Sequence, residues 1–233
     1  MSYLQSRWPA LALVLAGLSC NIYAVDGVVL IDQNRALAGN VTPGDAPGFP
    51  VTISVPGSYR LSGNLMVPDA HTSAISITAD HVTIDLNGFS IIGPTVCTGR
   101  PVTACNPTTS DNSGHGVDGG SQNNVTVLNG SVSGMGGFGI SLLGIGGSVE
   151  KVHADNNHLG IALRFGTVSG SISIANFTYG ISCANATCTG NVARGNGSAG
   201  ILASCPASVV GNTSFLNGQN LLTSRRARGL RTH

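Results

Sequence analysis

The feature that most constrains this chain is a glycine followed by an aliphatic residue, recurring about every 20 residues. The pairs are Gly116-Val117, Gly139-Ile140, Gly160-Ile161, Gly180-Ile181 and Gly200-Ile201. Their intervals are 23, 21, 20 and 20 residues, and the next step falls on Leu221-Leu222. A repeat of this length indicates stacked structural units, each of which covers the apolar face of its neighbour.

Two further markers share this period. An asparagine lies four residues before four of these five glycines, at Asn112, Asn156, Asn176 and Asn196, and Asn217 holds the same place before Leu221. A second register runs through residues 168–170, 188–191 and 209–212. We interpret the asparagines as structural, able to form a hydrogen-bonded ladder along the stack. The glycines are expected to turn the corners, including at positive φ.

The composition indicates that these units form strands and not helices. They are rich in Gly, Ser, Thr, Asn and Val, which are poor helix formers. They contain short alternating runs, such as residues 82–86 and 125–128, which place one face inward and the other toward solvent. Charged residues make up only 9% and mean hydropathy is +0.24, which excludes a disordered chain. The sequence therefore predicts an all-β parallel β-helix, or β-solenoid, of roughly eight to ten coils of about 20–23 residues each.

The chain divides into four predicted segments. They are a signal peptide at 1–24, N-terminal strands and a cap at 25–74, β-helix repeats at 75–222 with a loop insertion at 93–115, and a basic disordered tail at 223–233. Arg7 precedes an apolar stretch at residues 10–18, which is too short for a bilayer span of about 20 residues. Lipid attachment at Cys20 is the alternative. We expect an exported protein that is secreted, periplasmic or at the cell surface.

Five cysteines follow the predicted signal peptide, and an exported protein can form disulfides. Cys97 and Cys105 bracket a short loop and form the best pair. Cys183 can pair with Cys188 or, one coil later, with Cys205. Because five is odd, one thiol is left over. A zinc site is disfavoured because the chain has no CxxC pair.

Charge and hydropathy restrict the possible partners. Residues 25–224 carry ten acidic and six basic side chains, so this part lacks the excess of basic residues that nucleic-acid binding needs. No apolar run after the predicted signal is long enough for a transmembrane span. The coil that opens at Leu221 gives way to the basic tail, which predicts end-to-end association through an uncapped C-terminal coil.

Several stretches resemble the right-handed β-helix repeat proteins of bacteria, within the pectin-lyase-like superfamily. They are PGSYRLSGNL at 56–65, ITADHVTIDLNGFSIIGP at 77–94 and NNVTVLNGSVSGMGGFGI at 123–140, followed by the later Gly-Ile and Gly-Asn repeats. The resemblance covers roughly residues 27–222. It implies a right-handed parallel β-helix, and it leaves the activity open because one fold hosts many functions.

Pectate lyases, polygalacturonases and alginate epimerases share that superfamily, so we searched for their chemistry. A lyase needs a base, and usually calcium held by Asp or Glu. The candidate catalytic residues, around the single lysine, are Lys151, His153, Asp155 and Arg164. The candidate binding residues, a coil or more earlier, are Asp111, His115 and Asp118. Asp85 begins a D-x-N-G sequence and is interpreted as a turn residue that bonds its own backbone.

The sequence is consistent with two different functions. The first is an exported β-helix that binds extracellular or cell-surface polysaccharide without catalysis, with no cofactor and no metal. The alternative is a small polysaccharide lyase, or another uronan-active enzyme, in which calcium would take part. The only sizeable loop lies around residues 97–105, so walls for a deep catalytic cleft are scarce, which favours binding.

Overall fold

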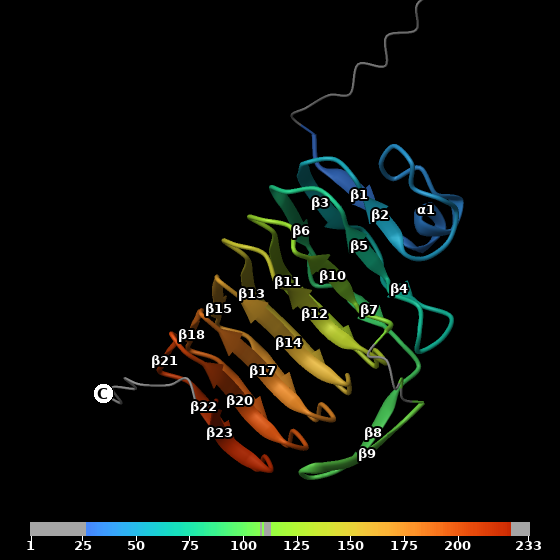
Figure 1. Cartoon of the computed structure of the whole chain (residues 1–233). Coiled ribbons are helices and arrows are strands. Elements are labelled where there is room, and N and C mark those ends of the chain that lie inside the picture. The colour runs from blue at the N-terminus through green and yellow to red at the C-terminus, as the bar shows by residue number, and fades with distance from the viewer. Residues whose placement is uncertain (1–26, 108, 110–112, 225–233) are drawn as a thin grey trace, which may run out of the picture.

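A computed structural model describes residues 27–107, 109 and 113–224, in which the chain forms a parallel β-solenoid (Figure 1). Eight coils stack along one axis, and each contributes one strand to an eight-stranded sheet, called sheet B here. The rest of each coil belongs to a 13-stranded sheet, called sheet A. The helix α1 (Gln33–Ala38) is the one helix in the described part of the chain. The predicted all-β parallel fold is confirmed.

Successive coils supply neighbouring strands in both sheets, so the pairing within the solenoid is parallel. Sheet B consists, in order, of β2 (Val51–Ile53), β5 (Ile75–Ile77), β10 (Val117–Gly120), β12 (Phe138–Leu142), β14 (Leu159–Arg164), β17 (Tyr179–Ala184), β20 (Ala199–Ser204) and β23 (Gln219–Thr223). The main run of sheet A consists of β1 (Val29–Ile31), β3 (Gly57–Leu61), β6 (Val82–Asp85), β11 (Thr126–Ser133), β13 (Ser148–Asp155), β15 (Thr167–Ser169), β18 (Thr187–Thr189) and β21 (Ser208–Val210). Its side strands are β4 (Leu65–Met66), β7 (Ser90–Ile92), β16 (Ile172–Ile174), β19 (Val192–Arg194) and β22 (Thr213–Phe215).

The glycine–aliphatic marker identifies the register of sheet B. The aliphatic residue of each pair lies directly over that of the next coil, and the column extends beyond the marker in both directions. The column is Val51, Ile75, Val117, Ile140, Ile161, Ile181, Ile201 and Leu221. From Val51 to Ile201 each member is at most 2% exposed. Full burial of such a side chain contributes about 1.5–3 kcal/mol, which is the main force that stacks the coils.

The glycines of these pairs have a different role from the expected one, since none of the five has a positive φ. A Cβ atom on Gly160 would lie 2.5 Å from the carbonyl oxygen of Gly180 and 2.8 Å from Nδ2 of Asn176. Close approach between coils therefore excludes a side chain at this position. The left-handed corners lie elsewhere, for example at Gly170 and Gly190, with φ of 55° and 64°.

Buried asparagines form the predicted ladder beside these glycines. Asn157 donates from Nδ2 to Oδ1 of Asn176, Asn176 to Asn196, and Asn196 to Asn217, at 3.2, 2.9 and 2.9 Å. In the coil that ends at Gly160, the ladder residue is Asn157 and not Asn156. Asn156 instead occupies a left-handed corner, with φ 56°. The predicted first member, Asn112, lies outside the described residues.

The coils begin earlier than residue 75, where the repeat pattern predicts them. Strand β1 pairs in parallel with β3, and β2 pairs in parallel with β5. These first coils lack the glycine–aliphatic marker, so the pattern did not reveal them. The α1 helix follows β1 and begins at an Asp32 cap, whose carboxylate accepts from the Arg35 amide at 2.9 Å. No helix in the described residues is both long and apolar enough to span a bilayer.

Two disulfides are present, and both match predicted pairs. Cys97 bonds Cys105, and Cys183 bonds Cys188. The second lies inside the solenoid, where both cysteines are fully buried and join sheet B to sheet A across a corner. Cys205, the alternative partner of Cys183, is the free cysteine of the described residues.

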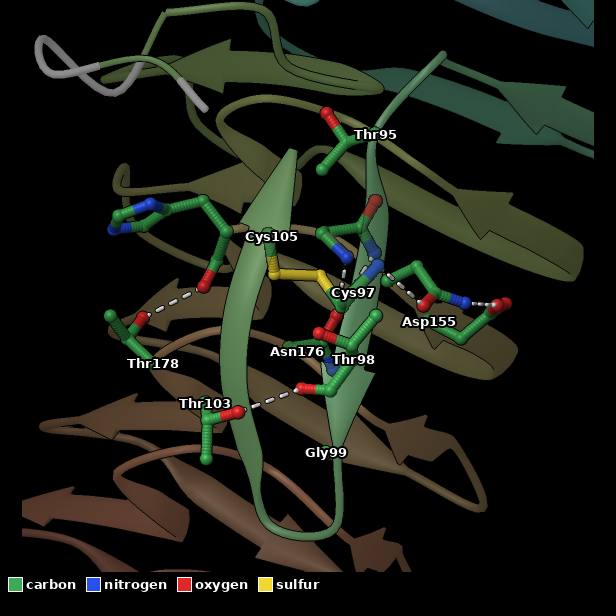
Figure 2. Close-up of a disulfide and its surroundings, with 12 residues drawn as sticks. Thr95, Cys97, Thr98, Gly99, Thr103, Cys105, Asp155, Asn176 and Thr178 are labelled. Carbon is green, nitrogen blue, oxygen red and sulfur yellow. Dashed lines mark hydrogen bonds between the residues drawn. A yellow bond between two sulfur atoms is a disulfide. The ribbon is translucent and has the colours of Figure 1, made fainter. Parts of the chain in front are cut away.

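The predicted loop insertion contains an antiparallel hairpin, β8 (Val96–Gly99) and β9 (Val102–Asn106), stapled by the first disulfide (Figure 2). The hairpin lies across later coils than the one it leaves (Figure 1). Its Val102 amide donates to the Gly195 carbonyl at 3.0 Å, and the Cys97 amide donates to Oδ1 of Asn156 at 3.3 Å. Cys97 and Val102 pack with Ala175 in a small separate apolar cluster. The hairpin therefore contacts three successive coils and holds them together.

Candidate functional site

Seven coils place a hydroxyl side chain at the same outward position of sheet A. The column is Ser58, Thr83, Thr126, Ser148, Thr167, Thr187 and Ser208. The next residue in each strand points inward, as strand alternation requires, and Val149, Val168 and Cys188 there are fully buried. Six intervals of about 4.8 Å give this hydroxyl column a length of roughly 29 Å. The solenoid thus presents a straight, periodic row of hydrogen-bonding groups.

A shallow groove runs beside the C-terminal part of the hydroxyl column, with a volume of about 590 Å³. It follows the corner between sheet B and sheet A, and three coils contribute three residues each. The lining residues are Phe165, Gly166 and Thr167, then Asn185, Ala186 and Thr187, then Pro206, Ala207 and Ser208. Equivalent residues stack along the solenoid, so this corner groove runs across the strands and parallel to the axis. All nine lining residues are uncharged.

Phe165 is the large aromatic residue of the corner groove, and 39% of it is exposed. The guanidinium carbon of Arg164 lies 4.6 Å from the centroid of its ring, a cation–π contact. Phe165 has φ 55°, in the left-handed region that a bulky residue rarely adopts. The residue that follows Ala184 in the next coil, Asn185, has φ 51°, and asparagine adopts this conformation more readily.

A second outward column flanks the hydroxyl column on sheet A. It is charged toward the N-terminus, where Arg60 and Asp85 form a 3.0 Å ion pair, and Glu150 is the last charged member. In the three coils of the corner groove its members are Ser169, Thr189 and Val210, which are neutral. Asp85 also accepts from the Asn87 amide at 2.9 Å, which confirms its interpretation as a turn residue.

Three of the four predicted catalytic residues lie on β13, and the fourth, Arg164, ends β14 in sheet B. Lys151 lies at an exposed corner in β13 with φ 52°, where the next two coils have Gly170 and Gly190. His153 is exposed in the same strand and pairs with Ile172 of the following coil. Its surroundings therefore include an aliphatic neighbour and no second acid or base in that register.

Asp155 ends β13, and two neighbouring side chains donate hydrogen bonds to its carboxylate. Its Oδ2 accepts from the Ser133 hydroxyl at 3.1 Å and from Nδ2 of Asn156 at 2.8 Å. Arg164 is in sheet B, where it ends β14 and pairs with Ala184. Of the predicted residues, only Arg164 contacts the corner groove, through Phe165.

Of the two predicted binding residues that the structure describes, Asp118 lies in sheet B and His115 lies just before it, away from β13 of sheet A. Asp118 is in β10, and His115 precedes it and accepts from the Phe138 amide at Nδ1, at 2.9 Å. Burial lowers the pKa of His115, and the negative charge of Asp118 partly opposes this effect. Asp111 lies outside the described residues. The structure therefore does not bring His115 and Asp118 together with Lys151 and Asp155.

The hydroxyl column and the corner groove were missed at the sequence level. Their signal is the residue before each aliphatic of the second register: Thr167 before Val168, and Thr187 before Cys188. Thr and Ser are common throughout this chain, so without the register they do not stand out. In the described residues, no three His, Cys, Asp or Glu side chains converge as a metal site requires.

Comparisons of the chain with family models, with curated proteins and with solved structures find no match. One fold hosts many functions, so the function of this solenoid depends on the side chains of its surface.

Proposed function

We propose that this chain is an exported β-solenoid that binds extracellular or cell-surface polysaccharide without catalysing its cleavage. The observation that carries the proposal is the hydroxyl column, which repeats one hydrogen-bonding group per coil over seven coils. A polysaccharide repeats its own hydroxyl groups along an extended chain. A periodic ligand and a periodic surface can form many similar weak contacts, whose free energies add in one binding event.

The separation of Lys151 from the predicted binding residue Asp118 favours binding over cleavage. A lyase needs its base within hydrogen-bonding reach of the proton that it removes, and near the groups that neutralise the substrate acid. Lys151 lies at a corner of sheet A, whereas Asp118 lies in sheet B. The resemblance to pectin-lyase-like proteins therefore agrees with the solenoid fold, whereas the positions of these residues do not favour lyase chemistry.

Export is supported by the disulfides, since two of them in a chain of this size are typical of an oxidising compartment. The predicted signal peptide at residues 1–24 lies outside the described residues. The polysaccharide would then be one found outside the cell or on its surface.

Binding and cleavage can be separated with one set of polymers. Purified protein is incubated with pectate, polygalacturonate, alginate, xylan and cellulose, with and without calcium. Co-sedimentation or affinity electrophoresis measures binding, ultraviolet absorbance measures the unsaturated products of a lyase, and a reducing-end assay measures hydrolysis. We expect retention on at least one polymer without new absorbance or new reducing ends. Absorbance or reducing ends that rise with enzyme concentration would refute the non-catalytic proposal, and retention on no polymer would refute binding.

A matched pair of variants tests the hydroxyl column itself. Thr187→Val keeps the β-branched shape and removes one outward hydroxyl, so it should weaken binding without unfolding the protein. Thr213→Val makes the same change in β22, on a side strand of sheet A outside the hydroxyl column, and should bind as the wild type does. Equal affinity of the Thr187 variant and the wild type would exclude the column from the binding surface.

We also propose that copies of this chain associate end to end through the last described coil. Val210 is 57% exposed and Leu216 is 56% exposed, in a coil whose strands have a neighbour on one side only in the described structure. Leu216 has φ 56°, so Leu216→Asn removes the apolar group and suits the backbone. We propose that Val210→Lys with Leu216→Asn lowers self-association measured by sedimentation velocity. An unchanged distribution that already contains dimers would exclude this surface.

A further inference from the structure

Resting on the proposed function, we infer that the corner groove binds a single neutral polysaccharide chain parallel to the solenoid axis, and discriminates against uronic-acid polymers. The groove combines a row of hydroxyls, a floor of small residues and one exposed aromatic ring in three successive coils. This combination suits the alternating polar edges and apolar faces of a pyranose chain.

The repeat of the groove matches that of an extended sugar chain. Successive coils are about 4.8 Å apart, close to the length of one pyranose unit in an extended β-linked polymer. Each coil supplies the same set of groups, from Gly166 and Thr167 to Ala186 and Thr187. Small floor residues let a chain approach the backbone, while the hydroxyl wall can donate to and accept from the sugar hydroxyls.

Neutrality follows from the distribution of charge. A uronic-acid polymer carries one carboxylate per sugar, so a matching site would repeat a cation in each coil. Arg164 is the cation beside the groove, and the equivalent residues of the next two coils are Ala184 and Ser204. The Arg164 guanidinium already lies over the Phe165 ring. The nearest outward residues of sheet A in these coils are neutral as well.

Phe165 supplies a second, independent argument. Its left-handed backbone conformation is unfavourable for a bulky residue, and such strain is kept where the surroundings or the function require it. Phe165 is 39% exposed, so core packing offsets only part of that strain. An aromatic ring at the edge of a groove can stack on the apolar face of a sugar, which explains why a phenylalanine occupies this corner.

The decisive variant is Phe165→Asn, because Asn185 shows that asparagine suits this corner in the next coil. The variant should fold at least as stably as the wild type. Phe215→Ser is the matched control, since Phe215 is 38% exposed, contacts Arg194 in a similar way and lies outside the corner groove. Both variants remove one half-exposed phenyl ring beside an arginine.

Isothermal titration with cellohexaose, xylohexaose, mannohexaose and hexagalacturonate tests the inference. We expect one neutral hexamer to bind more tightly than hexagalacturonate, with about a tenfold loss for Phe165→Asn and none for Phe215→Ser. Preference for hexagalacturonate would overturn neutrality, and equal binding by Phe165→Asn would overturn the placement; both outcomes leave the proposed function standing. Binding of no neutral hexamer overturns the inference, and only the further absence of retention on every polymer would remove the proposed function too.

Discussion

The side-chain amide of Asn176 donates to Oδ1 of Asn196 in the next coil at 2.9 Å, and the backbone amide of Asn176 donates to the same oxygen at 3.0 Å. Both asparagines are completely buried. Asn196 in turn donates to the carbonyl oxygen of Ser173 and to Oδ1 of Asn217. One side chain thus satisfies four hydrogen-bonding groups, and three of them belong to the fully buried residues Asn176 and Ser173.

We therefore predict that Asn196→Ala lowers the free energy of unfolding by about 3 kcal/mol or more. The substitution leaves the Asn176 amides without their acceptor, and each unsatisfied buried group costs roughly 1–3 kcal/mol. Urea denaturation followed by circular dichroism measures the change. Asn34→Ala, at an exposed position of α1, is the control and should change stability by less than about 0.5 kcal/mol. A similar small effect at Asn196 would show that the ladder contributes little.

The relation between this ladder and the sequence shows what the repeat pattern can predict. The Gly-Ile marker identifies the register because one buried aliphatic column requires one residue type in every coil. The same marker is less informative for the asparagines, since Asn156 and Asn157 are adjacent and only the backbone decides which one turns inward. The repeat pattern does not predict the corner groove. It depends on Phe165, which departs from the repeat, and on hydroxyl residues that are common in the whole chain.

Lys151 provides a test of backbone strain at the corner of sheet A. It has φ 52° where the following coils have glycine. Lys151→Gly should therefore raise the free energy of unfolding by about 0.5–1 kcal/mol, after the entropy of glycine in the unfolded chain is subtracted. Lys151→Ala retains the Cβ atom and should show no such gain. Chemical denaturation measures both variants, and a loss of stability in the glycine variant would contradict the strain argument.

Stability should also depend on pH through His115, whose pKa burial lowers from its usual 6.5. A lowered pKa means that the unfolded chain binds the proton more readily, so the stabilisation is present above pH 6.5 and is lost as pH falls through the folded-state pKa. Protonation also removes the acceptor for the Phe138 amide. The carboxyl groups of Asp69 and Asp80 have pKa values lowered from 3.8, so they stay ionised above pH 5.

The variant His115→Asn separates the titration from the hydrogen bond. Its Oδ1 can take the place of Nδ1 as acceptor for the Phe138 amide, but it does not titrate. The free energy of unfolding of the variant should fall less steeply than that of the wild type between pH 7.5 and 5.5. Some slope should remain, because burial also lowers the pKa of His158, whose Nδ1 has no partner. Parallel curves for the two proteins would show that His115 does not cause the dependence.

The hairpin gives the last prediction, which concerns local rather than global stability. The disulfide of Cys97 and Cys105 closes a loop with a sequence separation of 8, which stabilises the hairpin by about 2–3 kcal/mol. Replacing both cysteines by serine should accelerate hydrogen exchange of the Val102 amide on the order of a hundredfold. Without the disulfide, the hydrogen bond from the Val102 amide to the Gly195 carbonyl should break more often. Amides of β14 and β17 serve as internal controls and should keep their protection. Equal exchange at Val102 with and without the disulfide would show that packing against Ala175, rather than the staple, holds the hairpin to the coils.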